Sequence, residues 1–217
     1  MIIKHYQLEK LKNNKYNFFL FYGENDGFKN DAIDIITKSG FTKNILKYEE
    51  NEILKNYSNF LSEITNKSFF EEKKIIIISR VSEKIFTLID EIRNKNIQDV
   101  KIIINSRILD KKSKLRANFE KQKDLICVAF YSDDNVMLAN LANRFFIENK
   151  ISISREIINL LVERCRGDRS NLKNELSKIE AFSENKKNIS LEEMLALTNL
   201  AENYSFTELA DACLSKN

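Results

Sequence analysis

The sequence contains no proline or tryptophan, one histidine, four glycines and three cysteines among its 217 residues. The cysteines, Cys127, Cys165 and Cys213, form no Cys-x-x-Cys pair, and His5 is the only imidazole. A structural zinc site needs four such ligands, usually in paired spacings, so we expect no metal site. Cys127 and Cys165 stand in apolar stretches and are predicted to be buried thiols, which suits a reducing cytoplasm.

Long apolar runs and a large charge of one sign are also missing. The apolar runs are only a few residues long, whereas a membrane span needs roughly 20, and the amino-terminal residues contain no signal-peptide core. Basic residues number 35 and acidic residues 32, so the formal net charge is +3. A protein that coats nucleic acid would need a large basic patch. We therefore expect a cytoplasmic protein that neither enters a membrane nor coats nucleic acid.

Short apolar runs alternate with helical patterns over the first part of the chain. Nearly continuous Ile, Val and Phe is typical of strands covered on both faces, as in a parallel sheet. The predicted strands are 18–22, 45–48, 75–78, 100–104 and 125–130. Between them, apolar residues at helical spacing predict crossover helices. Residues 1–133 are therefore predicted to form a doubly wound α/β domain.

After the fifth predicted strand the pattern becomes helical throughout. The predicted helices lie near 135–148, 155–165, 170–183 and 191–200. Gly167 is expected to end the second helix, and Ser190 with Glu193 makes a capping box for the fourth. We expect residues 134–201 to form a small helical lid domain. Residues 202–217 are expected to begin a helix of a further domain that is cut short.

The polar turn after the first predicted strand lies where many α/β domains bind phosphate. A phosphate loop needs several glycines, a lysine for the outer phosphates and a Ser or Thr for magnesium. The turn contains Gly23, Asn25 and Asp26 but has no Gly-Lys-Ser/Thr sequence. Asp26 is the expected N-cap of the following helix. We predict a degenerate phosphate loop that binds no nucleotide, and therefore no cofactor.

Other positions at which an ATPase carries nucleotide-binding residues also lack the expected residue types. The third predicted strand leads into Ser79 and Arg80 without a carboxylate for magnesium. Asn105 stands where a γ-phosphate sensor would lie, although a polar cap on a strand end is the simpler interpretation. Arg169 lies one position before the place of a nucleotide-sensing arginine. Together these losses predict a non-hydrolysing protein with no catalytic residues.

Two adjacent aromatic residues, Phe69 and Phe70, stand in a charged segment before the third predicted strand. Both cannot face one core from a helix end, so one of them is expected to be exposed. The simpler alternative is that it packs under the sheet edge. The functional interpretation is a hydrophobic plug that enters a partner's pocket, as aromatic anchors do in protein interfaces.

Basic residues cluster after the fourth predicted strand, at Lys111, Lys112, Lys114 and Arg116. They are candidates for facing the phosphates of duplex DNA. A solvated helix face is the simpler interpretation, because acids are interspersed and no aromatic residues stack nearby. We expect little DNA binding by the isolated chain.

Taken together, these features resemble the delta subunit of the bacterial DNA polymerase III clamp loader. The similarity extends along the chain and combines weak motifs in matching order, at 21–26, 68–70, 109–115, 174–179 and 204–209. The resemblance implies an AAA+ fold that does not hydrolyse ATP. It also implies a subunit that binds the ring-shaped sliding clamp and opens it during DNA replication. Ser68, Phe69 and Phe70 match the family's clamp-binding element.

The resemblance further implies partners: the sliding clamp, the other clamp-loader subunits, and primed DNA only within the complex. The subunit would then belong to a DNA polymerase complex without a catalytic site of its own. A non-catalytic scaffold of another AAA+ assembly is the alternative, but it gives the Phe69–Phe70 pair no role. An active ATPase is disfavoured because its phosphate ligands are missing.

Overall fold

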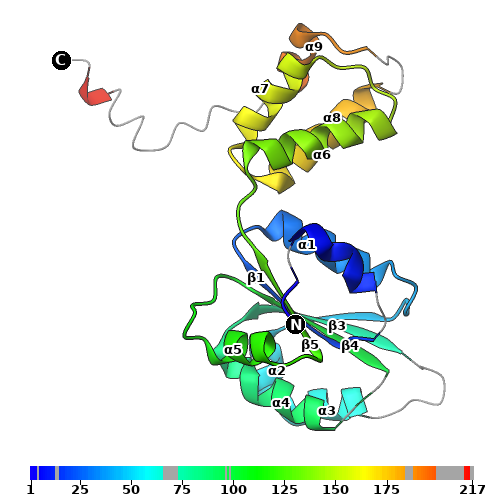
Figure 1. Cartoon of the computed structure of the whole chain (residues 1–217), viewed down its shortest axis with the longest axis vertical. Coiled ribbons are helices and arrows are strands. Elements are labelled where there is room, and N and C mark those ends of the chain that lie inside the picture. Colours follow the sequence, from blue (N-terminus) through cyan, green and yellow to red (C-terminus); the bar gives the residue numbers. More distant parts are fainter. Residues whose placement is uncertain are drawn as a thin grey trace. The chain divides into compact units, whose positions relative to one another are not determined.

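The computed structural model describes residues 1–3, 5–12, 15–65, 73–95, 97, 99–183, 188–198 and 213–215. The chain divides into two compact units, residues 1–131 and 132–217. In the described residues, the first unit is a sheet with helices on both faces and the second is a group of helices (Figure 1).

Five strands form the sheet of the first unit, in the order β2-β3-β4-β1-β5. The strands are β1 (Phe18–Gly23), β2 (Ile45–Glu49), β3 (Lys74–Val81), β4 (Val100–Ser106) and β5 (Leu125–Phe130). Every neighbouring pair is parallel, which confirms the prediction made from the continuous apolar runs. β3 continues beyond its predicted end, with a register shift between Ile78 and Val81.

Helices cover both faces of this sheet (Figure 1). One face carries the 3₁₀ helix η1 (His5–Lys12) and α1 (Asp26–Thr37). The other carries α2 (Glu50–Lys55), α3 (Tyr57–Thr65), η2 (Glu83–Ile85), α4 (Phe86–Asn94) and α5 (Lys114–Lys121). The helices that lie between successive strands return the chain to the edge where the next parallel strand begins.

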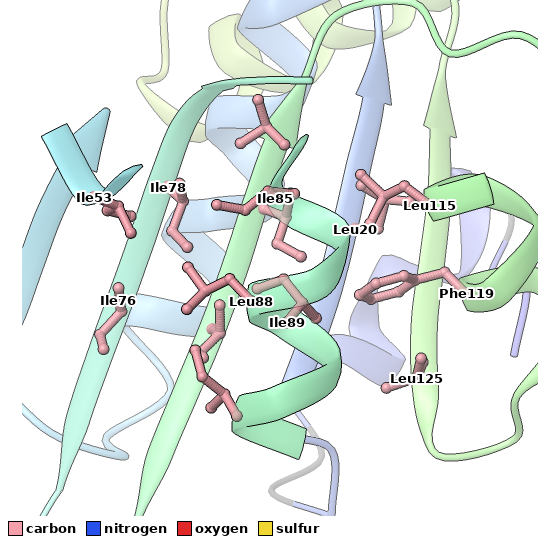
Figure 2. Packing of buried hydrophobic residues seen from close by; sticks show 14 of the residues in the cluster. Leu20, Ile53, Ile76, Ile78, Ile85, Leu88, Ile89, Leu115, Phe119 and Leu125 are labelled. Carbon is pink, nitrogen blue, oxygen red and sulfur yellow. The ribbon is translucent and has the colours of Figure 1, made fainter. Parts of the chain in front are cut away.

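The side chains of β1 alternate between the two cores, as the period of a strand requires. Leu20 points toward α4 and α5, whose residues Leu88, Ile89 and Phe119 lie over the sheet in Figure 2. Phe21 points to the opposite face, where its ring meets that of Phe130 at 5.3 Å between centroids. Burial of each such side chain contributes about 1.5–3 kcal/mol. The carboxyl end of β1 is thus held firmly from both sides.

The second unit contains α6 (Asn135–Glu148), α7 (Arg155–Cys165), α8 (Arg169–Ser183) and α9 (Leu191–Leu197). These helices agree with the predicted ones, except that α8 begins one residue earlier and α9 ends before Thr198. The capping box of Ser190 and Glu193 is formed. α7 ends at Cys165, and the left-handed backbone of Arg166 and Gly167 (φ 47° and 81°) follows it. The predicted helix start in 202–217 lies outside the described residues, apart from 213–215.

Candidate functional site

The turn between β1 and α1 is the predicted degenerate phosphate loop, and it is short. Only Glu24 and Asn25 separate the strand from the helix. The N-cap is Asn25 and not Asp26, which is the first residue of α1. Asn25 Oδ1 accepts a hydrogen bond from the backbone N–H of Phe28 at 2.9 Å, while its Nδ2 donates to the carbonyl of Tyr131 at 3.0 Å. The amide of Asn25 can therefore cap the helix and also donate a hydrogen bond to the chain just after β5. An aspartate carboxylate has no donor and could not make this second bond.

Gly23 places this turn close to the neighbouring strand. Its φ of 127° is a conformation that favours glycine, and a Cβ atom there would lie 2.0 Å from the carbonyl oxygen of Phe130. Gly23 therefore allows β1 to approach β5 closely, which is a packing role. In a phosphate loop, glycines instead turn backbone N–H groups toward the ligand.

Lys29 lies behind the turn and is almost completely buried. Its Nζ atom donates to the carbonyl oxygens of Gly23 and Ser106, each at 2.9 Å. The same ammonium group pairs with Asp26 Oδ1 at 2.8 Å, although Lys29 is 1% exposed and Asp26 79% exposed. A cation from α1 thus lies between the carboxyl ends of β1 and β4. Open α/β sheets bind ligands at this edge, and here the protein's own side chain lies between β1 and β4.

Sequence reasoning missed Lys29. A lysine spaced i, i+3 from an acid on a helix is usually a surface pair. The available signal was its spacing of three and seven residues from Ala32 and Ile36, which both lie on the buried face of α1. The carbonyl partner on β4 is 77 residues away in the sequence, so local patterns could not reveal it.

A buried acid does lie near the end of β3, but it comes from a helix. Glu50 of α2 is 4% exposed. Its carboxylate accepts hydrogen bonds from the backbone N–H groups of Ser82 and Ile85 at 3.0 and 3.1 Å, and from the Ser82 hydroxyl at 2.7 Å. These bonds hold the turn that leads into α4. Glu50 is therefore used as a structural cap.

Arg169 is committed to an ion pair inside the second unit. Its Nε and Nη2 atoms lie 2.7 Å from the two carboxylate oxygens of Asp133. The side chains of Arg169 and Asp133 are 8% and 0% exposed, respectively. A two-point pair of this kind is among the strongest side-chain interactions and fixes the guanidinium in one orientation. Arg169 thus joins the start of α8 to the beginning of the same unit.

The predicted basic cluster lies in two different environments. Three of its residues are exposed: Lys111 and Lys112 on the turn before α5, and Lys114 at the first residue of that helix. Arg116 is partly buried: it pairs with Glu120 at 2.7 Å, donates to the carbonyl of Leu109 at 3.1 Å and lies 4.9 Å from the ring centre of Tyr22. The lysines are therefore the residues of this cluster that a partner could reach.

Beside these lysines, a groove of about 830 Å³ lies at the carboxyl ends of β3 and β4. The basic groups come from Lys84, Arg107, Lys112 and Lys114, and the acids are Glu83 and Asp110. The Glu83 carboxylate already accepts a hydrogen bond from the backbone N–H of Leu115 at 3.1 Å. The mixed charge gives the groove no clear preference for one ligand.

The three cysteines differ in their burial. Cys127 and Cys165 are buried, as predicted, and Cys213 is exposed. Burial raises the pKa of Cys127 to about 12 and that of Cys165 to about 11. Among the described residues, no group of three or more His, Cys, Asp and Glu could hold a metal ion. No helix in the same residues is long and apolar enough to cross a bilayer.

The Ser68–Phe69–Phe70 element lies outside the described residues. Its flanks are described: α3 ends at Thr65, and β3 begins at Lys74. The element therefore belongs to the connection between α3 and β3.

The strand order, the parallel pairing and the helical unit that follows define a fold of the AAA+ type. The Bacillus subtilis DNA clamp loader delta protein YqeN superposes with a TM-score of 0.59 at 13% identity, over 89% of this chain and 62% of that chain. Thermotoga maritima proteins also match. Domain III of its replication initiation protein DnaA gives a TM-score of 0.52 at 16% identity, over 89% of this chain and 88% of that domain.

A point mutant of Thermotoga maritima RuvB gives a TM-score of 0.57 at 14% identity, over 88% of this chain and 64% of that one. This chain thus spans less than two thirds of the length of the delta protein and of RuvB. At such identities the likeness shows the shared fold alone. No family model and no curated protein matches the sequence.

Proposed function

We propose that this chain is a delta-type subunit of a bacterial DNA polymerase III clamp loader, which binds the sliding clamp and opens it without hydrolysing ATP. The observation that carries the proposal is Lys29, whose buried ammonium group fills the ligand edge of an AAA+ fold. Asn25 supports it, because its side chain accepts from the N–H of Phe28 in the first turn of α1, which would otherwise be available to phosphate. An AAA+ domain whose own side chains bond to its phosphate turn suits a binding role.

The proposed clamp contact is the Phe69–Phe70 pair, preceded by Ser68. Burying two phenylalanine side chains in a partner contributes roughly 3–6 kcal/mol before the costs of association are subtracted. Contacts from a polar rim, such as Glu71, Lys73 and Lys74, add to it. The clamp-loader delta protein among the structural neighbours is consistent with this assignment.

Opening a ring requires more than binding to it. A ligand shifts an equilibrium only by the difference between its affinities for the two states. In this proposal the Phe69–Phe70 contact is more favourable with an open clamp interface than with a closed one. The binding energy of this contact would then replace ATP hydrolysis by this subunit as the source of opening.

The other partners follow from the same proposal. Other clamp-loader subunits would contact the faces of the AAA+ unit. Primed DNA would be reached only in the complex, with Lys111, Lys112 and Lys114 as the exposed candidates for phosphate contact. The isolated chain is not proposed to bind DNA.

The direct test is binding of the purified chain to its cognate sliding clamp, measured by biolayer interferometry. We expect micromolar or tighter binding, and a loss of at least about tenfold in the Phe69→Ala/Phe70→Ala variant, since truncated aromatic anchors commonly cost 1.4 kcal/mol or more. The control is Val136→Ala/Ile147→Ala, which removes two exposed apolar side chains from α6. The absence of binding by folded wild type would overturn the proposal.

A second candidate function is a non-catalytic scaffold in another AAA+ assembly. It is favoured by the similar TM-scores of the DnaA domain and RuvB, 0.52 and 0.57 against 0.59 for the delta protein. This candidate predicts no effect of the Phe69→Ala/Phe70→Ala change on association with the chain's partner. The clamp-binding experiment therefore separates the two.

A further inference from the structure

The turn after β1 holds the last residues of the first unit. Asn25 Nδ2 donates a hydrogen bond to the carbonyl of Tyr131 at 3.0 Å, and the backbone N–H of Asn25 donates to the carbonyl of Phe130 at 3.4 Å. Both bonds lie inside the first unit, which ends at Tyr131. The chain that leaves β5 is therefore held by the turn up to its last residue in this unit.

The corner between α7 and α8 holds the first residues of the second unit. Both carboxylate oxygens of Asp133 are bound by Arg169 at 2.7 Å, and the Asp133 side chain is 0% exposed. Gly167 approaches the same residue so closely that a Cβ atom on it would lie 3.3 Å from the Asp133 carbonyl oxygen. Asp134 then caps α6 by accepting a hydrogen bond from the N–H of Met137 at 2.7 Å. The chain that enters α6 is therefore held from Asp133 onward.

These two sets of contacts lie on either side of one residue of the connection, which we define as residues 131–133. Ser132 lies between the held residues Tyr131 and Asp133. Each residue has only two soft backbone dihedral angles, so contacts this close together leave the connection few rotations by which to change its course. Asn25 belongs to the degenerate phosphate turn, and Arg169 stands beside the expected position of a nucleotide-sensing arginine. The two elements that would contact nucleotide in an ATPase therefore contact the connection here.

We propose that Asn25 and Arg169 are positioning residues that together hold the connection between the two units, each from within its own unit. They set the course of the chain through Ser132 without nucleotide. The amide and the guanidinium suit this task because both donate hydrogen bonds in a fixed geometry. This inference goes beyond the proposed function and does not depend on the clamp contact.

Conservative replacements can remove the two contacts separately. Asn25→Asp retains a side-chain oxygen that caps α1 but removes the donor to the Tyr131 carbonyl. Arg169→Lys retains a cation beside Asp133 but not the planar two-point contact. The matched control is Asn143→Asp, which makes the same amide-to-carboxylate change where the amide donates to a backbone carbonyl within α6.

The first measurement is the rate at which chymotrypsin cleaves the full chain after Tyr131, followed by mass spectrometry as the appearance of a fragment that begins at Ser132. The Tyr131 side chain is 67% exposed, so the rate reports how often the backbone on either side is released. We expect Asn25→Asp to raise the rate roughly three- to tenfold, as the loss of a hydrogen bond of ordinary strength would. Arg169→Lys should raise it as well, and Asn143→Asp should stay within about twofold of wild type.

The same digests separate release of the connection from unfolding. Phe119 and Phe146 are buried in α5 and α6, so cleavage after them requires unfolding of the first and the second unit, respectively. A positioning role predicts that Asn25→Asp speeds cleavage after Tyr131 more than cleavage after either buried residue. Equal increases at all three sites, or no difference between Asn25→Asp and Asn143→Asp, would overturn the proposal.

A second measurement follows the two units directly, by the distribution of distances between spin labels on Lys38→Cys and Ser177→Cys. Both positions are exposed, Lys38 at the C-cap of α1 and Ser177 on α8, and the exposed thiol is removed by Cys213→Ser. The distribution should broaden in Asn25→Asp and in Arg169→Lys, and magnesium with ATP should leave that of wild type unchanged. A distribution that narrows with ATP would overturn the proposal, because nucleotide would then set the connection.

Discussion

The Nζ atom of Lys29 lies 2.9 Å from the carbonyl oxygen of Gly23, so the helix after the first strand sends a cation back to that strand's end. The second strand-end carbonyl, of Ser106, lies at the same distance. An ammonium group so deeply buried is tolerated only because it is paired and hydrogen-bonded. The edge that would bind nucleotide in a related fold is thus part of the structural framework.

Replacing Lys29 by Met should destabilise the α/β unit by about 2–4 kcal/mol, because two carbonyls and a carboxylate lose their shared donor. Urea denaturation of the variant and wild type measures this loss. The control is Lys38→Met at the C-cap of the same helix, where the pair with Asp34 is exposed on both sides and contributes little. Equal stability of Lys29→Met and wild type would show that the buried contacts are not needed.

Magnesium and ATP at millimolar concentration should leave the melting temperature of the wild-type chain unchanged. A ligand that binds the folded state at a hundred times its Kd would add about 2.7 kcal/mol of stability and raise that temperature visibly. Differential scanning fluorimetry with and without the nucleotide makes the comparison. A saturable rise would contradict the conclusion that Lys29 and Asn25 occupy the phosphate position.

Arg169→Ala should destabilise the helical unit by about 3–5 kcal/mol, since the Asp133 carboxylate would be left buried without its partner. The Asp133→Ala/Arg169→Ala double variant should lose less than the sum of the two single variants. Arg93→Ala is the comparison, because Arg93 also contacts Asp124 through two atoms but at an exposed site. A loss no larger than that of Arg93→Ala would contradict the structural role of the buried pair.

Alkaline pH should destabilise the fold through its buried thiols and tyrosines. Burial raises the pKa of Cys127 from 9.0 to about 12. Burial, followed by the hydrogen bond to Glu63, raises that of Tyr48 from 10.0 to about 12. The folded state holds these protons more tightly than the unfolded state. Their contribution is complete below pH 9 and is lost as the pH rises toward 12.

Urea midpoints at pH 7.5, 9 and 10.5 should therefore fall, with a smaller decrease in a Cys127→Ala variant. Thiol reactivity supplies an independent check. At pH 8, a thiol reagent should modify exposed Cys213 quickly and leave Cys127 and Cys165 unmodified until the protein is denatured. Rapid modification of Cys127 in the native protein would contradict its burial.

The elements could be predicted from the sequence because their signals are local. Continuous Ile, Val and Phe marked the parallel strands, and the Ser190–Glu193 capping box marked α9. The N-cap of α1 was predicted one residue late, since Asn and Asp are both good caps. The choice depended on the Tyr131 carbonyl, 106 residues from Asn25 in the sequence.

The contacts of the candidate site could not be predicted in the same way. Lys29 bonds to a carbonyl on β4, and Arg169 pairs with a residue 36 positions earlier. Both contacts form only when distant elements come together. The partial burial of Arg116 also depends on its contacts with Tyr22 and Glu120, which the sequence pattern did not indicate.

The central claim is that this chain favours an open clamp, and the most direct measurement compares its affinities for two forms of its cognate clamp. One form is the closed wild-type ring, and the other is a clamp variant whose subunit interface is disrupted so that it stays monomeric. We predict at least about tenfold tighter binding to the monomeric form, a difference of 1.4 kcal/mol available for opening. Equal affinity for the two forms would contradict the claim.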